Sequence, residues 1–267
     1  MGHMAASCEI CYIAYTPWGK FRAFNIPGWR QANREDRENI MKLVRNLLAF
    51  LFLLIFSGAA IAAATVITVK GSVMVTPAKG SPEPLAAGQR IEPGALIKTS
   101  ANGETTMRFD DGQLLALASN TSFVISKYRF NAHKPEDSNF TGTLLKGGLR
   151  AVTGIIGETN KRNVTVKTEV ATIGIRGTDF MLYQENGLYF SVLDGAISTT
   201  NAGGEALFDA KVSALGMVAN ADTIGKPAAE EQFPAAALAA FRILQMYPLS
   251  DNIRKPNPKD PTCSDRR

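Results

Sequence analysis

The stretch "ATIGIRGTDF", residues 171–180, places one arginine and one aspartate inside an otherwise apolar run that also contains two glycines. Arg176 and Asp179 are three residues apart, and Gly174 and Gly177 flank the arginine. Such a run suits a phosphate loop, a catalytic loop or a turn between β-strands. A Walker-type phosphate loop needs a lysine followed by serine or threonine after its glycines. The stretch has no lysine, so we favour the turn of a β-domain.

Short β-branched and aromatic runs alternate with turn residues from Thr65 onward. "TVITVKGSVMVTP", residues 65–77, gives two such runs about Gly71, and residues 94–109 give two more about a turn at 101–103. The dipeptide Asp111-Gly112 is a hairpin signal. The pattern predicts an all-β fold of many short strands, arranged as a sandwich, a barrel or a solenoid-like stack.

Two polar segments depart from this alternation. Residues 130–142, "FNAHKPEDSNFTG", contain a proline among polar residues and are expected to form an exposed loop. Residues 248–267 are polar and proline-rich, and we expect them to be largely disordered.

Residues 233–247, "FPAAALAAFRILQMY", predict a C-terminal helix with Pro234 in its first turn. Leu238, Phe241 and either Leu244 or Ile243 would face the core. We expect this helix to cap an open edge of the β-structure.

The segment from Met41 has the three regions of a secretory signal peptide. Lys42 and Arg45 precede an apolar run over residues 47–56, and small residues follow up to Ala62. Cleavage is expected after Ala62, or alternatively after Ala64. Removal of residues 1–62 would leave 22 cationic and 20 anionic side chains, a net charge of +2, so a general affinity for nucleic acid is not supported.

A membrane anchor is the competing interpretation, because residues 47–67 form an uncharged stretch long enough to span a bilayer. The second half of this stretch is rich in alanine, glycine and threonine, which stabilise a membrane span poorly. Membrane association is expected only if the 47–67 segment is retained. Both interpretations place the residues after about 65 across the membrane.

Residues 1–40 show no clear period, and whether Met1 or Met41 is the true start stays open. They are either an upstream extension that the cell does not use or a short cytoplasmic interaction segment. Cys8 and Cys11 form a Cys-x-x-Cys pair, but His3 alone is a weak further ligand for zinc. After a start at Met41 only Cys263 remains, and we expect it to be a free thiol.

Candidate catalytic groups are scarce. His3 and His133 are the two histidines, so few residues could act as the base of a catalytic triad or as ligands of a metal. Asp110 and Asp111 are neighbours, and neighbouring residues of a strand point to opposite faces. We expect no catalytic, metal or cofactor site, and therefore a protein that is not an enzyme.

The order of several motifs together resembles the FecR domain, named for the ferric citrate regulator. "GSVMV", "LAAGQRIEPGALIKTSANGETTMRFDDGQLLALASNTSFVI", "GGLRAVTG", "VKTEVATIGIRGTDF" and "FSVLDGAIS" follow one another over about residues 65–200. The family's T-P-x-A-x-x-G-I-R-G-T-D/E-F stretch is matched by Thr168, Glu169, Ala171, Gly174, Ile175, Arg176, Gly177, Thr178, Asp179 and Phe180. Glu169 stands where the family usually has proline.

The resemblance implies an extracytoplasmic β-domain over residues 65–200 that binds or senses, followed by further strands and the helix over 201–247. In well-known members this domain follows a cytoplasmic anti-sigma segment and one membrane helix, and it receives a signal from a TonB-dependent outer-membrane receptor. The apolar segment of this chain looks cleavable, so the chain is more similar to secreted, standalone members.

Two arginines are expected to hold the fold together. The planar donor fork of Arg176 would bind backbone carbonyls or the Asp179 carboxylate, as a latch at the end of a strand. Arg150 would tie two strands. The set expected to be structural or to contact a partner comprises Asp111, Gly112, Gly147, Arg150, Thr168, Gly174, Arg176, Gly177, Thr178, Asp179 and Phe180.

The sequence thus predicts a non-enzymatic periplasmic or secreted bacterial protein with a FecR-type β-domain, which binds or signals to a protein partner in the cell envelope. A single-pass inner-membrane regulator of the anti-sigma type, with residues 1–46 acting on a cytoplasmic partner, is the first alternative. A purely structural envelope module is the second.

Overall fold

The computed structural model describes residues 38–39, 41–47, 63–160 and 162–248. Residues 41–47 are helical with exposed side chains, and they belong to a unit separate from residues 61–267. Within the described residues no helix is long and apolar enough to cross a membrane. The predictions for residues 1–37, for the apolar run 48–62, for Cys263 and for the tail 249–267 lie outside the described residues.

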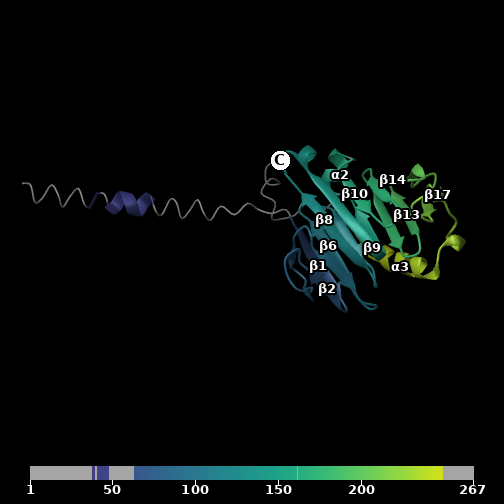
Figure 1. Ribbon diagram of the computed structural model, residues 1–267, viewed down its shortest axis with the longest axis horizontal. Coiled ribbons are helices and arrows are strands. Elements are labelled where there is room, and N and C mark those ends of the chain that lie inside the picture. Colours follow the sequence, from purple (N-terminus) through teal and green to yellow (C-terminus); the bar gives the residue numbers. More distant parts are fainter. Residues whose placement is uncertain (1–37, 40, 48–62, 161, 249–267) are drawn as a thin grey trace, which may run out of the picture. The chain divides into compact units, whose positions relative to one another are not determined.

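Strands dominate residues 63–248 and form two mostly antiparallel sheets that share one long strand, β9 (Asn139–Val152), as Figure 1 shows. The first sheet has the order β4 (Arg90–Ile91), β1 (Ala64–Lys70), β6 (Glu104–Phe109), β7 (Leu114–Leu117), β9 (Asn139–Val152), β12 (Asp179–Gln184), β13 (Leu188–Asp194), β16 (Leu215–Val218) and β17 (Lys226–Pro227). The second sheet has the order β3 (Glu83–Pro84), β2 (Val73–Thr76), β5 (Leu96–Thr99), β8 (Ser122–Arg129), β9, β10 (Val164–Lys167), β11 (Thr172–Ile175), β14 (Ala196–Asn201) and β15 (Gly204–Asp209). Only the β9–β10 pair is parallel among these described pairs.

Strand β9 passes from one sheet to the other at Gly147. Its first part pairs with β8 and β10, and the part from Gly147 onward pairs with β12. Gly147 has a φ of +89°, and a Cβ there would lie 2.5 Å from Thr121 Oγ1. Both the positive φ and the lack of space require glycine at this crossing.

The main core lies between the two sheets. Side chains on the inner faces alternate with outward ones, as the period of a strand requires, and the largest fully buried ones include Phe109, Phe123, Phe140, Phe180, Phe190 and Phe208. Rings from opposite sheets meet edge to face, as Phe190 and Phe208 do with centroids 4.5 Å apart. The all-β prediction is confirmed, as an open two-sheet arrangement that is not closed into a barrel.

The predicted turns are present. The chain turns between β5 and β6 at residues 100–103, and Gly112 has a φ of +86° between β6 and β7. The strands on either side of Gly71 belong to different sheets, so they are no hairpin.

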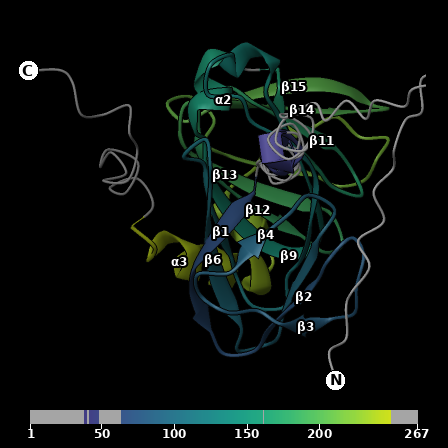
Figure 2. The same ribbon diagram turned by 90° about the vertical axis from the view of Figure 1, so that its left-hand side faces the viewer.

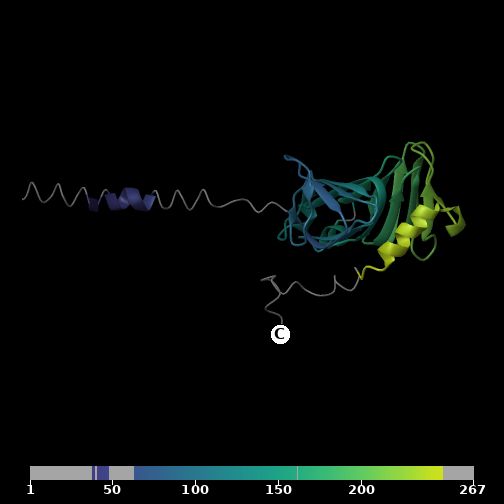
Figure 3. The same cartoon turned by 90° about the horizontal axis from the view of Figure 1, so that it is seen from below.

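The predicted C-terminal helix is α3 (Ala235–Gln245), with Pro234 as its N-cap residue. Phe241 and Leu244 are buried, whereas Leu238 and Ile243 are half-buried. The helix lies across the outer face of the first sheet, where Figure 3 shows it over the C-terminal strands (Figure 3). Our expectation that it caps an open edge is therefore wrong.

The reason lies in the strands beneath the helix. Leu114 and Ala116 of β7 and Met181 and Tyr183 of β12 point outward, away from the main core, and form a second apolar cluster with α3. Both faces of these strands are apolar, so the outer face needs a cover of its own. The sequence run "LLAL" of β7 is consequently buried at every position.

The predicted loop at 130–142 is shorter than expected. Residues 130–138 form the loop, with the 3-10 turn η1 (Pro135–Asp137) inside it, whereas Asn139 already starts β9. Phe140 is buried and packs against Phe109 with ring centroids 5.1 Å apart.

A short helix, α2 (Ile155–Thr159), was not predicted, because one turn is too short to show a helical period. A second 3-10 turn, η2 (Glu230–Gln232), precedes α3, and Figure 2 shows α2 and β3 at opposite ends of this unit (Figure 2).

Candidate functional site

A buried ion pair between Arg150 and Asp179 lies at the centre of the motif region. Arg150 on β9 stands opposite Met181 on β12, so it shares the outer face of the first sheet with Asp179. Its Nε donates to Asp179 Oδ1 at 2.9 Å and its Nη2 to Oδ2 at 2.7 Å. Both residues are buried. The two parallel hydrogen bonds are the bidentate geometry that favours arginine over lysine.

The remaining donor of the same guanidinium holds the end of α3. Arg150 Nη1 donates to the carbonyl oxygens of Leu244 at 3.2 Å and Tyr247 at 2.8 Å. These carbonyls end a helix, where backbone acceptors lack partners and the helix dipole favours a positive charge. Arg150 therefore joins β9, β12 and α3, and our prediction that it ties two strands is confirmed and extended to the helix.

Tyr247 anchors the chain just after α3. Its hydroxyl donates to Glu104 Oε2, and the ammonium of Lys70 lies 5.2 Å from the centre of its ring. Lys70 also pairs with Glu104 at 3.3 Å. Burial, and then the hydrogen bond to Glu104 and its negative charge, raise the pKa of Tyr247 above its ordinary value. The end of the helix is thus fixed from two sides.

The predicted latch between Arg176 and Asp179 is wrong. The side chain of Arg176 is exposed and makes no hydrogen bond within the described residues, and its backbone N–H donates to the Ala196 oxygen at 3.2 Å. Arg176 follows β11 of the second sheet, whereas Asp179 begins β12 of the first. Their side chains belong to the outer faces of two opposed sheets, because Ile175 and Phe180 point inward between them.

The sequence did not reveal that Asp179 pairs with Arg150. Arg150 and Asp179 are 29 residues apart, and only the register between β9 and β12 brings them together. A charged residue at the centre of a predicted apolar strand was the available signal, since such a residue needs a partner when it is buried.

Other motif residues lie where the chain passes from β11 in the second sheet to β12 in the first. Gly177 has a φ of +72°, which lets the chain leave β11 and enter β12. The N–H of Thr178 donates to Thr153 Oγ1 at 2.7 Å, and the N–H of Thr153 donates to the Thr178 oxygen at 3.0 Å. Phe180 lies in the main core.

The ends of β10 and β11 use two further motif positions. Thr168 Oγ1 accepts hydrogen bonds from the N–H groups of Val170 and Ala171 in the turn that joins the strands. Gly174 faces Ser198, whose Oγ would lie 2.7 Å from an added Cβ. Contact of any of these motif residues with a partner stays a prediction.

Asp111 is more than a turn residue. It is buried, and its Oδ1 accepts hydrogen bonds from the Gln113 N–H at 3.2 Å and the Tyr128 hydroxyl at 3.2 Å. Its Oδ2 has no hydrogen-bond partner among the described residues. Burial raises the pKa of Asp111 to about 6, although these hydrogen bonds oppose the rise. Burial and the neighbouring carboxylate also raise the pKa of Tyr128.

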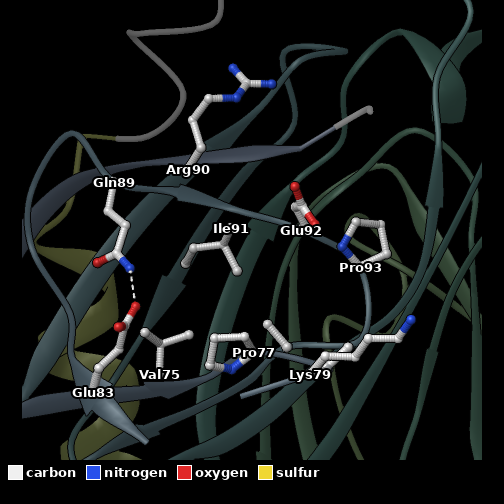
Figure 4. Close-up of a pocket in the computed structure, with 11 residues that line it drawn as sticks. Val75, Pro77, Lys79, Glu83, Gln89, Arg90, Ile91, Glu92 and Pro93 are labelled. Carbon is white, nitrogen blue, oxygen red and sulfur yellow. Dashed lines mark hydrogen bonds between the residues drawn. The ribbon is translucent and has the colours of Figure 1, made fainter. Parts of the chain in front are cut away.

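A surface cavity of about 440 Å³ lies beside strands β2 to β4 (Figure 4). Val75, Ile91 and two prolines give it apolar walls, and Gln89 donates to Glu83 at 2.8 Å on its rim. The lining contains both acids and bases but no histidine, cysteine or serine. No group of three or more metal-binding side chains occurs in the described part of the chain. The cavity can take an apolar side chain.

Comparison with known proteins adds the family. The family model described as FecR protein matches residues 95–198, from just before β5 to the middle of β14. The FecR match therefore covers residues 95–198. The resemblance in the sequence is thereby confirmed, while the wider boundary of 65–200 stays a prediction. The FecR domain contains Arg150 and Asp179, and α3 lies outside it.

Two solved structures align with part of the chain. Both are described as a proposed anti-sigma factor from Parabacteroides distasonis; one has 13% identity and a TM-score of 0.39, the other 12% and 0.40. Each alignment covers 49% of this chain and 59% of the solved chain, so this chain spans little more than half of their length. A comparison with curated proteins finds no match.

Proposed function

We propose that this protein is a non-enzymatic signalling module outside the cytoplasmic membrane, and that its FecR domain binds a protein of the cell envelope. The match over residues 95–198 supports a regulatory or signalling role. The single observation that carries the proposal is that the charged motif residues Arg150 and Asp179 form their hydrogen bonds inside the fold. Arg150 and Asp179 bind each other and the end of α3, so they make a rigid scaffold and leave recognition to exposed strands and loops.

The start of the β-structure supports release from the membrane. The backbone N–H of Ala63 donates to Asp110 Oδ2 at 2.8 Å, and Arg90 Nη2 lies 3.1 Å from the same oxygen. Cleavage after Ala62 would turn this N–H into an α-ammonium group. Asp110 would then accept hydrogen bonds from two cations, Arg90 and the new amino group. The processed chain would keep the contact and strengthen it.

Photo-crosslinking in the producing bacterium tests the proposal. A photoreactive amino acid placed at exposed positions of the FecR domain, Arg176 among them, should yield a discrete crosslinked product in the envelope fraction. The same amino acid at the buried Phe180 is the control. Absence of any envelope product from every exposed position would contradict protein binding.

A further inference from the structure

Strand β15 (Gly204–Asp209) ends the second sheet and pairs on one side only, with β14. The other sheet ends in the described part of the chain are β3, β4 and β17, of two residues each. A long edge strand presents unpaired backbone groups to any extended chain that approaches it. Strand β15 is therefore the edge best suited to receive another strand.

The register shows which groups are free. Ala210 donates its N–H to Gly195 across the ladder at 3.0 Å, and backbone groups of alternate residues point to opposite sides of an antiparallel strand. Ala206 and Phe208 therefore face β14, whereas the N–H and C=O groups of Glu205 and Leu207 point away from it. Within residues 63–248 no other backbone group pairs with those of Glu205 or Leu207.

Both ends of this free edge are closed. The Asp209 oxygen accepts hydrogen bonds from Val212 and Ser213 at 3.1 and 2.9 Å. At the other end, a Cβ on Gly203 would lie 2.4 Å from the Asp222 oxygen, so the neighbouring loop blocks the approach there. The open edge runs from Glu205 to the N–H group of Asp209, whose carbonyl oxygen is already occupied.

The outward side chains of this edge alternate acid, apolar and acid. Glu205 and Leu207 are exposed, with Leu207 at 57%, and Asp209 is half-exposed. The inward Phe208 packs against Phe190 in the core and fixes the strand. An exposed leucine between two carboxylates is a small binding surface on a rigid frame.

A second copy of the chain fits this edge poorly. Antiparallel pairing of two β15 strands about Leu207 would set Glu205 of each copy opposite Asp209 of the other, and like charges directly opposite are destabilising. A segment with a basic, an apolar and a basic residue at alternate positions would instead match each carboxylate with a cation and Leu207 with an apolar side chain.

We propose that residues 205–209 bind an extended basic–apolar–basic segment of a protein partner, which adds to the second sheet as a strand beside β15. This inference rests on the proposed protein-binding function and names the surface that performs it. Backbone hydrogen bonds from Glu205 and Leu207 would supply affinity, and the alternate side chains would supply specificity.

Fluorescence anisotropy with the full-length chain, purified as the cell delivers it, tests the proposal. The probe is a labelled synthetic peptide that alternates threonine with lysine, valine and lysine. It should bind saturably, and Glu205→Lys should weaken it about tenfold or more, as expected for a like charge in place of a matched pair. Glu230→Lys makes the same charge change at an exposed position of η2 and should leave binding unchanged.

Two further measurements make the outcome decisive. A peptide with methylated backbone nitrogens should lose binding, since it cannot donate to the edge. Equal effects of Glu205→Lys and Glu230→Lys, or no binding of the unmethylated peptide, would overturn the proposal. So would a concentration-dependent dimer in sedimentation that Leu207→Pro abolishes, because a second copy would then be the occupant. Crosslinking to an envelope protein would still stand in these cases, so failure here is distinct from failure of the proposed function.

Discussion

Arg150 is the residue whose loss should damage the fold most. Removing it leaves the buried Asp179 carboxylate and the last carbonyls of α3 without their charged donor. Breaking a buried ion pair from one side costs about 3 to 5 kcal/mol. We expect Arg150→Ala to lower the free energy of unfolding by that amount in urea denaturation, and Arg150→Lys to recover only part of it.

The exposed Arg176 is the matched control for this substitution. Arg176→Ala removes the same charge from a side chain that makes no hydrogen bond in the described part of the chain, so its effect should stay below about 0.5 kcal/mol. A larger loss for Arg176→Ala than for Arg150→Ala would restore the latch that the structure contradicts.

Asp111 should make stability depend on pH. Its pKa is raised from 3.8 to about 6 in the folded state, chiefly by burial, so the folded state holds the proton more tightly than the unfolded chain. The stabilisation is fully present below pH 3.8 and is lost as the pH rises through about 6. The loss is about 3 kcal/mol by linkage.

Asp111→Asn removes this titration and keeps an oxygen for the hydrogen bonds of Gln113 and Tyr128. The unfolding free energy of the wild type, relative to that of the variant, should therefore fall by about 2 kcal/mol as the pH rises from 4 to 7, the part of the total that lies in this window. Urea midpoints across this range give the measurement, and a difference that is constant with pH would refute the burial effect.

Sequence reasoning at single residues succeeded where the chemistry is local. The turn at Gly177 follows from glycine's freedom at positive φ. The ion pair of Arg150 could not be found this way, because strand register decides it and register depends on the whole packing of both sheets.

Among the strands, β9 depends most on one backbone position. An alanine at Gly147 would have an unfavourable φ of +89° and a Cβ at 2.5 Å from Thr121 Oγ1. We expect Gly147→Ala to cost on the order of 3 to 5 kcal/mol. Thermal or urea unfolding of the variant measures this directly.

Gly177→Ala is the control for the strained backbone alone. Gly177 also has a positive φ, +72°, but a Cβ there meets nothing within 4 Å. Its cost should be about 1 to 2 kcal/mol, the penalty of a left-handed conformation. Equal costs for both substitutions would mean that the close approach to Thr121 does not constrain the crossing.

The strands and α3 could be predicted from alternation and turn residues, but their partners could not. Whether a strand joins the first or the second sheet depends on contacts between residues far apart in the chain. The position of α3 on a sheet face follows from the outward apolar residues of β7 and β12. A continuous apolar run such as "LLAL" in the sequence indicates a strand that is buried on both faces.

The described residues from 63 to 248 form a single β-structure that begins at Ala63. The all-β class followed from the period of the sequence, and the FecR assignment followed from the order of its motifs. Neither the period nor the motif order predicted that β9 is shared between two sheets, because the composition of a strand does not show where it changes partners. The contact of Ala63 with Asp110 joins this architecture to the proposed processing.

Intact mass spectrometry of the protein recovered from the native cell envelope tests the extracytoplasmic signalling role most directly. We expect a chain that starts between Ala63 and Thr65, since the small residues up to Ala62 suit signal peptidase and the backbone nitrogen of Ala63 lies beside Asp110. A mass that still includes residues 1–62, found in the cytoplasm or in the inner membrane, would contradict release into the envelope.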